Sequence, residues 1–291
     1  MILNYSLHKI TQKDSCPFSE TEYSNFKFGD TFYAEKFASA LFNGFINEYK
    51  DLILSKSEII LLPSPYHAIP TASNFLCSFF KIKLNEFLFG HGKQACVETK
   101  IHRLQTYVED YGNMDFEQRI NLISNDTYYL DKHFLENKFC IFLDDIKITG
   151  SHERTVNKIL DKYGAKGEFH FIYFAELVNK DIHPSIENHY NYFAIKSVYD
   201  IIEIINADTF CFNTRMVKYI LLMEEKNFAA VINNIPYQKK QELFNLAISN
   251  NYHQISDYQN NINQLHNNKL WLLTYKKDKE KTFMPLNSPL V

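Results

Sequence analysis

Short, largely apolar runs alternate with helical patterns through the middle of the chain, and this alternation limits the fold more than any other feature. The runs cover residues 58–63, 138–143 and 169–175. Apolar runs of this length are typical of strands that are buried on both faces of a parallel sheet. Because helical spacing separates them, the sequence predicts an α/β fold over roughly residues 30–180, a parallel sheet flanked by helices.

Capping and stop signals place the helices. Asp30 can cap a helix that is expected to run to about Tyr49. Pro70 suits the first turn of a second helix, which is expected to reach about Phe80. A third helical pattern follows the second strand and stops at Gly164.

The pattern divides the chain into three parts. Residues 1–30 form an N-terminal segment that precedes the core, and residues 31–195 form the α/β domain. Residues 196–291 are read as a helical C-terminal region with a polar tail, because apolar stripes at helical spacing recur there and no strand pattern interrupts them.

Composition excludes several classes of protein. The 291 residues carry 31 Lys+Arg against 34 Asp+Glu, a net charge of -3, so there is no nucleic-acid signature. No apolar run approaches the roughly 18 residues of a membrane span. The five cysteines are widely separated, which argues against a disulfide scaffold or a structural zinc. The first residues lack the pattern of a signal peptide, so a cytoplasmic location is expected.

One segment combines the features of a ligand site. In residues 142–152 a buried strand leads into two adjacent carboxylates, Asp144 and Asp145, and then into a hydroxyl-rich loop with one glycine and a helix. Ligands of open α/β sheets bind at the carboxyl ends of strands, where a helix N-terminus presents amides to phosphate. Carboxylates beside a phosphate favour hydroxyl groups or Mg²⁺. The segment therefore predicts a sugar phosphate site.

This segment resembles the loop of type I phosphoribosyltransferases that binds 5-phosphoribosyl 1-pyrophosphate (PRPP). The resemblance implies that Asp144 and Asp145 hold the ribose hydroxyls directly or through Mg²⁺, while the loop amides cradle the 5-phosphate. Ile148 stands where purine salvage members often carry an acid, Thr or Ala, and His152 replaces the usual final Thr or Ser. The implied PRPP positions here are Asp144, Asp145, Ile148, Thr149, Gly150, Ser151 and His152.

Two further segments match the family in position. Residues 62–72 lie where the family has its pyrophosphate loop, with Ser64, Tyr66 and His67 as hydrogen-bond donors, although the prolines of this segment can equally serve only to stiffen a turn.

Residues 93–106 lie where the family has a mobile loop that brings a cation to the leaving pyrophosphate. Lys100 and Arg103 are the catalytic candidates, and the competing reading is that they are solvated surface charges.

A fainter likeness connects the chain with the competence-associated ComF group of the same family. It is carried by residues 103–119 and the apolar residues 120–123 that follow. ComF proteins typically begin with a cysteine-rich zinc ribbon, whereas Cys16 is the only cysteine among the first 76 residues here.

The resemblance implies an enzyme that transfers the 5-phosphoribosyl group between PRPP and a nitrogenous base, with Mg²⁺ as cofactor and release of pyrophosphate. Its partners would be PRPP and a small base or nucleotide. The acceptor would lie under a hood built from residues 1–30 and the chain after residue 180. The resemblance leaves open whether the protein forms a homodimer. One alternative is a catalytically inactive regulator that senses PRPP or a nucleotide. Another is a phosphatase-like enzyme with Asp144 as nucleophile. The catalytic set is Asp144, Asp145, Lys100 and Arg103.

Overall fold

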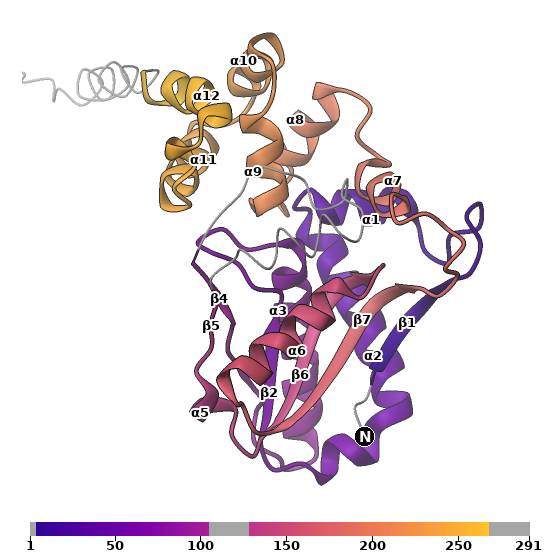
Figure 1. Ribbon diagram of the computed structural model, residues 1–291. Helices are drawn as coiled ribbons and strands as arrows, with labels where there is room; N and C mark the ends of the chain where they lie inside the picture. The colour runs from indigo at the N-terminus through magenta and orange to yellow at the C-terminus, as the bar shows by residue number, and fades with distance from the viewer. Residues whose placement is uncertain (1–3, 105–127, 268–291) are drawn as a thin grey trace, which may run out of the picture.

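A five-stranded parallel sheet lies at the centre of the protein, in the order β1-β7-β6-β2-β3 (Figure 1). The computed structural model describes residues 4–104 and 128–267. A separate antiparallel pair joins β4 (His102–Arg103) to β5 (Tyr128–Tyr129). The strands of the sheet are β1 (Asn4–Ile10), β2 (Ile59–Pro63), β3 (Val97–Glu98), β6 (Phe139–Lys147) and β7 (Glu168–Leu177).

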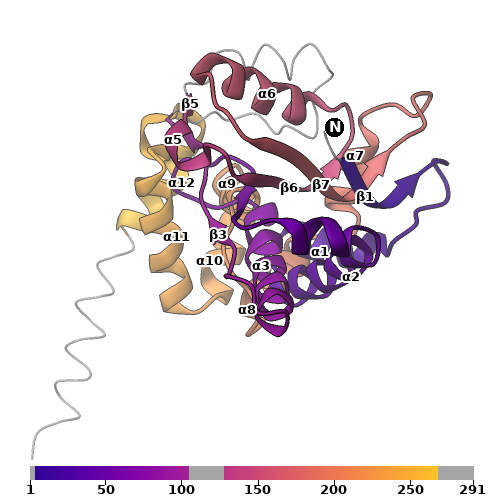
Figure 2. The ribbon, with the colours of Figure 1, turned by 90° about the horizontal axis from the view of Figure 1, so that it is seen from below.

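Helices cover both faces of this sheet (Figure 2). On one face α2 (Thr31–Ser55) and α3 (Ala72–Gly90) pack on inward side chains such as Leu61 and Ile141. On the other face α6 (Ser151–Tyr163) packs on their strand neighbours, such as Phe142. Alternate residues of each strand thus enter different cores. The predicted α/β architecture is confirmed.

The expected signals at Asp30 and Gly164 operate, whereas Pro70 precedes Thr71, the N-cap of α3, instead of lying in the first turn of that helix. Two helices also continue further than predicted. The Asp30 carboxylate accepts a hydrogen bond of 3.0 Å from the amide of Phe32 and begins α2. Gly164, in the left-handed region at φ 60°, ends α6. Helix α2 reaches Ser55 and α3 reaches Gly90, because apolar residues such as Ile53 and Leu88 extend their buried faces.

The N-terminal segment contributes an edge strand. The sequence places residues 1–30 before the core, but the structure pairs β1 in parallel with β7, with Tyr5 opposite Ile172. Polar side chains interrupt the apolar run of β1, as an edge strand permits, so the pattern of the three predicted strands does not extend to it. Helix α1 (Glu20–Lys27) follows and packs on α7 and α2.

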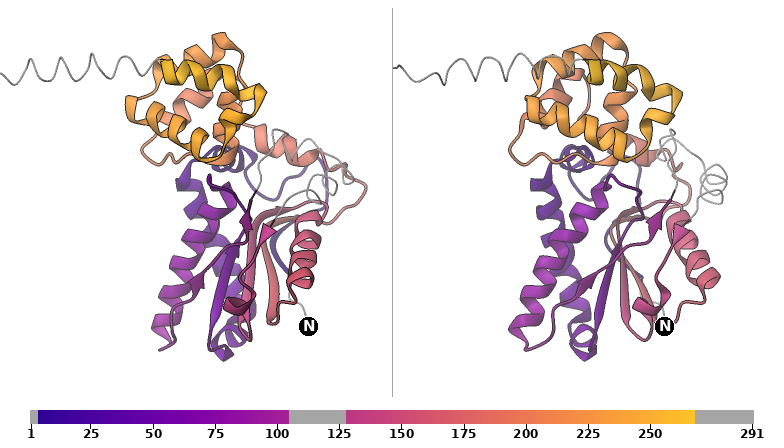
Figure 3. Two further views of the ribbon diagram at one scale, coloured as in Figure 1. Left: turned by 60° about the vertical axis from the view of Figure 1, so that its left-hand side comes forward. Right: turned by 90° about the vertical axis from the view of Figure 1, so that its left-hand side faces the viewer.

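The chain after β7 is helical as far as the structure describes it, and it lies beyond the carboxyl ends of the strands (Figure 3). A hydrophobic core of its own includes Met216, Phe228, Leu243 and Tyr258. Among the described helices none is long and apolar enough to cross a membrane. The elements are α7 (Ile186–Tyr192), α8 (Val198–Asn206), α9 (Thr214–Leu221), α10 (Glu225–Asn234), α11 (Tyr237–Ser249), η2 (Tyr252–Gln254) and α12 (Ser256–Asn267), with the short α5 (Lys132–Leu135) earlier in the chain.

A close backbone contact joins the N-terminal part to these helices. The amide of Cys211 donates to the carbonyl of Gly29 at 3.0 Å, and the amide of Thr31 donates to the carbonyl of Thr209 at 3.0 Å. Gly29 has φ 102°, and a Cβ atom there would lie 2.3 Å from the carbonyl oxygen of Cys211. Only glycine fits this junction.

Candidate functional site

The connections after β2 and β6 diverge at the carboxyl end of the sheet. These strands are neighbours, but the chain after β2 passes through α3 to β3, whereas the chain after β6 passes through α6 to β7 on the other side of the sheet order. Ligands of open α/β sheets bind in the crevice at such a switch point. A cavity of about 620 Å³ opens here, and both the loop of residues 64–71 and that of residues 148–150 line it.

The loop after β6 forms a preorganised helix N-terminus. Gly150 takes φ 70° at the N-cap of α6, and the hydroxyls of Thr149 and Ser151 are 2.8 Å apart. Arg154 braces the loop by donating to the carbonyl of Thr149 at 2.6 Å. Among the described residues no acceptor is found for the amides of His152 and Glu153. These amides suit a phosphate group.

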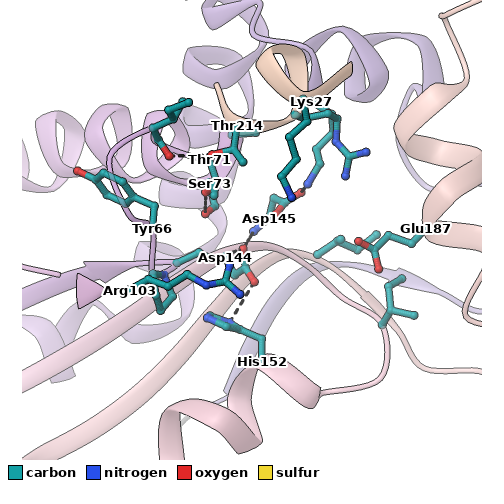
Figure 4. A pocket seen from close by; sticks show the side chains of 18 of the residues that line it. Lys27, Tyr66, Thr71, Ser73, Arg103, Asp144, Asp145, His152, Glu187 and Thr214 are labelled. Atoms are coloured by element: carbon teal, nitrogen blue, oxygen red, sulfur yellow. Dashed lines mark hydrogen bonds and ion pairs between the residues drawn. The ribbon is translucent and has the colours of Figure 1, made fainter. Parts of the chain in front are cut away.

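Asp144 is fixed by three contacts. Its Oδ1 accepts from the Ser64 hydroxyl at 2.7 Å and from the Asp145 amide at 2.9 Å. Its Oδ2 lies 3.1 Å from Nδ1 of His152 (Figure 4). Burial favours a higher pKa for Asp144, but the charge of His152 and the hydrogen bonds outweigh it and hold that pKa well below its usual range. Burial favours a lower pKa for His152, and Asp144 raises it. Each member of the pair therefore favours the charged form of the other.

Asp145 faces the N-terminal part of the chain instead. The Tyr23 hydroxyl donates to its Oδ2 at 2.5 Å. The Lys27 ammonium forms an ion pair with the same oxygen (Figure 4). Both partners belong to α1, and all three side chains are buried. Burial raises the pKa of Asp145, and the neighbouring Asp144 adds to the rise, while Lys27 opposes it. Helix α1 therefore closes over one carboxylate of the motif.

Asp144 and Asp145 can supply only part of the ligands of a magnesium ion. The described residues contain no group of three His, Cys, Asp or Glu side chains arranged to hold a metal ion. Mg²⁺ in proteins is often bound by one or two carboxylates together with substrate phosphates and waters. The oxygen donors of Asp144 and Asp145 fit that pattern, in which a substrate supplies the remaining ligands.

The loop after β2 lines the same cavity as the loop after β6, and several of its groups already have partners. Nδ1 of His67 lies 2.9 Å from the carbonyl oxygen of Arg103. The amides of Ala68 and Ile69 both donate to Oδ1 of Asn250, at 2.9 and 3.2 Å. The helical region therefore holds this loop in place.

The two predicted cations have different positions. Arg103 lines the cavity, and its amide donates to the carbonyl of Tyr66 at 3.3 Å. Lys100 is not among the lining residues, and its ammonium lies 3.9 Å from the centre of the Tyr66 ring. The part of the predicted mobile loop beyond Leu104 lies outside the described residues.

The comparison that decides the family is a match to a family model described as "PRTase ComF-like", which covers residues 1–265. The chain belongs to the ComF-like phosphoribosyltransferase family. The resemblance inferred from residues 142–152 is thereby confirmed, and so is the fainter likeness to the ComF group. No curated protein matches the chain.

Solved structures similar to this ComF-like chain include two hypoxanthine phosphoribosyltransferases. The enzyme from Staphylococcus aureus, in an orthorhombic crystal form, has 9% identity and a TM-score of 0.28, over 57% of this chain and 80% of its own. The enzyme from Trypanosoma cruzi, in complex with the product IMP, has 11% identity and a TM-score of 0.29, over 52% of this chain and 79% of its own.

Most of the predicted site positions of this phosphoribosyltransferase-family chain line one cavity. They are Ser64, Tyr66, His67, Arg103, Asp144, Asp145, Ile148, Thr149, Gly150, Ser151 and His152. Lys27, which the sequence analysis missed, also lines the cavity. No local signal identifies it, because it lies 118 residues from Asp145 in the chain.

Proposed function

We propose that this protein transfers the 5-phosphoribosyl group between PRPP and a nitrogenous base and releases pyrophosphate. The observation that carries the proposal is the position of the Asp144–Asp145 pair and the Gly150 loop on one wall of a switch-point cavity, in a chain of the phosphoribosyltransferase family. The loop after β2 lines the same cavity.

In this proposal the loop amides from Thr149 to His152 anchor the 5-phosphate, as helix N-termini bind anions. Asp145 binds the ribose hydroxyls once Lys27 and Tyr23 release it. Asp144, already engaged by Ser64 and His152, orients the two loops toward each other. The protein contributes mainly positioning, which lowers the entropic part of the barrier.

Mg²⁺, when bound at the two carboxylates and the substrate, would neutralise charge on the pyrophosphate. The bond between C1 of the ribose and the pyrophosphate oxygen breaks, and a bond from C1 to the acceptor nitrogen forms. The acceptor nitrogen releases its proton to solvent water, and the electron pair of the broken bond goes to pyrophosphate. Arg103 is placed to stabilise that charge from the cavity wall. Lys100 would join it only after leaving the Tyr66 ring.

A second function, PRPP or nucleotide sensing without catalysis, is favoured by two contacts. Asn250 occupies two amides of the loop that would receive pyrophosphate. Lys27 and Tyr23 occupy Asp145. A sensor would use ligand binding to release these contacts between the sheet and the surrounding helices.

The proposal is tested by calorimetric titration of PRPP with and without Mg²⁺, followed by a pyrophosphate-release assay with a panel of bases. The Asp145→Asn variant is expected to bind PRPP at least tenfold more weakly, and Asp161→Asn, at an exposed position of α6, serves as the matched control. If the unmodified protein does not bind PRPP, both functions are wrong. Binding without pyrophosphate release for any base would identify the sensor.

A further inference from the structure

One side of the cavity, which we call the roof, carries a cationic and aromatic surface formed by α9 and by Tyr192 of α7. One face of α9 and its C-terminal end, with Arg215, Lys218, Tyr219 and Leu222, lines the cavity. The spacing of three and four residues places these side chains on the same side of the helix. Tyr192 of α7 lines the same region.

The rings and the cations of this surface are neighbours. The Arg215 guanidinium lies 5.4 Å from the centre of the Tyr192 ring. The rings of Tyr192 and Tyr219 are 5.9 Å apart, and the buried Phe28 contacts them edge-on at 5.4 and 5.3 Å. Rings held in this way offer a fixed apolar surface to a planar molecule, beside cations that can bind an acidic group.

The proposed function assigns other parts of the cavity to PRPP. The α6 amides suit the 5-phosphate, and Arg103 lies on the wall near the loop after β2. A pyrophosphate is strongly hydrated and is normally bound by amides and Mg²⁺, so a surface that combines tyrosine rings with Leu222 fits a planar ring better.

A carboxylate completes the roof. Glu187 of α7 is 7% exposed and lines the cavity. In Figure 4 it lies at the opposite end of the cavity from Tyr66 of the loop after β2. The carboxyl oxygens of Glu187 are hydrogen-bond acceptors, so they suit an N–H group of an acceptor molecule.

We propose, on the basis of the proposed function, that the acceptor is a planar aromatic compound that carries a nucleophilic nitrogen and an acidic group, a carboxylate or a phosphate. Arg215 and Lys218 bind the acidic group, the rings of Tyr192 and Tyr219 contact the planar face, and Glu187 accepts a hydrogen bond from the N–H edge. The helical region thus selects the acceptor, while the sheet binds PRPP.

The test uses acceptors in matched pairs: orotate with uracil, 2-aminobenzoate with aniline, nicotinate with nicotinamide, and AMP with adenosine. Pyrophosphate release is measured with PRPP and Mg²⁺, and binding of each acceptor to the PRPP-loaded protein is measured by calorimetry. At least one acidic member is expected to exceed its neutral partner tenfold or more in kcat/KM, or in affinity where no turnover occurs. The first three pairs test a carboxylate, and the last tests a phosphate.

Variants assign the effect to α9. Lys218→Gln and Arg215→Gln are expected to lower the preference for the acidic member about tenfold while the Kd for PRPP stays unchanged, and Arg215→Lys is expected to restore part of it. Lys226→Gln, at an exposed position of α10 outside the cavity lining, is the control. Unchanged unfolding midpoints show that the variants are folded.

The outcomes separate the two proposals. Failure of the unmodified protein to bind PRPP overturns the proposed function and this inference with it. Normal PRPP binding with neutral acceptors preferred, or with neither member bound, overturns the inference alone. If Lys218→Gln loses as much affinity for PRPP as it loses preference for the acidic acceptor, the inference is also overturned, because α9 would then serve the pyrophosphate.

Discussion

At the scale of single residues, two adjacent aspartates of the same sequence motif have opposite electrostatic environments. Asp144 contacts His152 and Ser64, and its pKa is lowered even though burial acts in the opposite direction. Asp145 is buried against Asp144, and its pKa is raised in spite of Lys27. The difference arises from α6 and α1, which bring different partners to neighbouring positions. The two carboxylates are therefore expected to respond differently to substitution.

Removal of the ammonium group in Lys27→Met is expected to lower the free energy of unfolding by about 3 kcal/mol, because it leaves the buried Asp145 carboxylate without its counter-charge. The double variant Lys27→Met/Asp145→Asn is expected to be less destabilised than the single one. Urea denaturation at pH 7 measures both. Losses that simply add in the double variant would contradict a direct interaction between these side chains.

At the scale of elements, the edge strand β1 is held by a charge cluster as well as by its backbone ladder. Glu176 of β7 accepts from the Ser6 hydroxyl at 2.9 Å and from the Lys9 ammonium at 2.7 Å. The ammonium of Lys147 in β6 lies 3.4 Å from the second carboxylate oxygen of Glu176. The carboxylate therefore links three neighbouring strands.

This cluster makes stability depend on pH. Burial favours a higher pKa for Glu176, but the contacts with Lys9, Ser6 and Lys147 outweigh it and lower that pKa. A group with a depressed pKa stabilises the folded protein above its unfolded pKa of about 4.3, and this stability is lost as the pH falls through the folded pKa. Glu176→Gln is expected to be less stable at pH 7 and to lose less stability on acidification below about pH 4.

Urea denaturation at several pH values between 7 and 3 measures this difference. Glu203→Gln, at an exposed position of α8, provides the control and is expected to follow the unmodified protein. Parallel pH profiles for Glu176→Gln and the unmodified protein would show that the cluster does not stabilise the fold.

The loop after β2 depends on a residue from the far end of the chain. Asn250→Ala removes the acceptor for the amides of Ala68 and Ile69 and is expected to cost about 1–3 kcal/mol of stability. Hydrogen exchange at these two amides should become faster. Asn206→Ala is the control, because it removes a solvent-exposed hydrogen bond of 3.0 Å from the Asn206 side-chain amide to the carbonyl of Asn234. Stability and the exchange rates of the two loop amides should stay near their original values in this variant. Unchanged exchange in Asn250→Ala would mean that the loop is held by other contacts.

The sequence predicts those parts of the fold and site that have a local pattern. The three central strands, the caps at Asp30 and Gly164, and the PRPP motif are each encoded within a few neighbouring residues. Contacts between distant residues have no such pattern: Tyr23 lies 122 residues from Asp145, and Asn250 lies 182 residues from Ala68. Strand β1 was missed because an edge strand needs only part of its surface apolar.

At the scale of the whole molecule, the N-terminal part connects two hydrophobic cores, because two of its residues that are close in sequence are buried in different cores. Phe26 is buried in the core between the sheet, α2 and α3, whereas Phe28 is buried in the core of the C-terminal helices, with exposed fractions of 1% and 0%. Gly29 then contacts Cys211 directly. The segment between α1 and α2 therefore holds the roof of the cavity over the sheet.

Substitution of each phenylalanine by alanine tests whether the roof and the sheet are separate stability units. Both variants are expected to lose about 3–5 kcal/mol, because each leaves a cavity in a packed core. Phe28→Ala should accelerate hydrogen exchange mainly in α8–α12 and weaken acceptor binding, since its ring supports Tyr192 and Tyr219. Phe26→Ala should accelerate exchange mainly in α2 and α3. If the two exchange patterns coincide, the protein unfolds as one unit, and the roof and the sheet are not separate stability units.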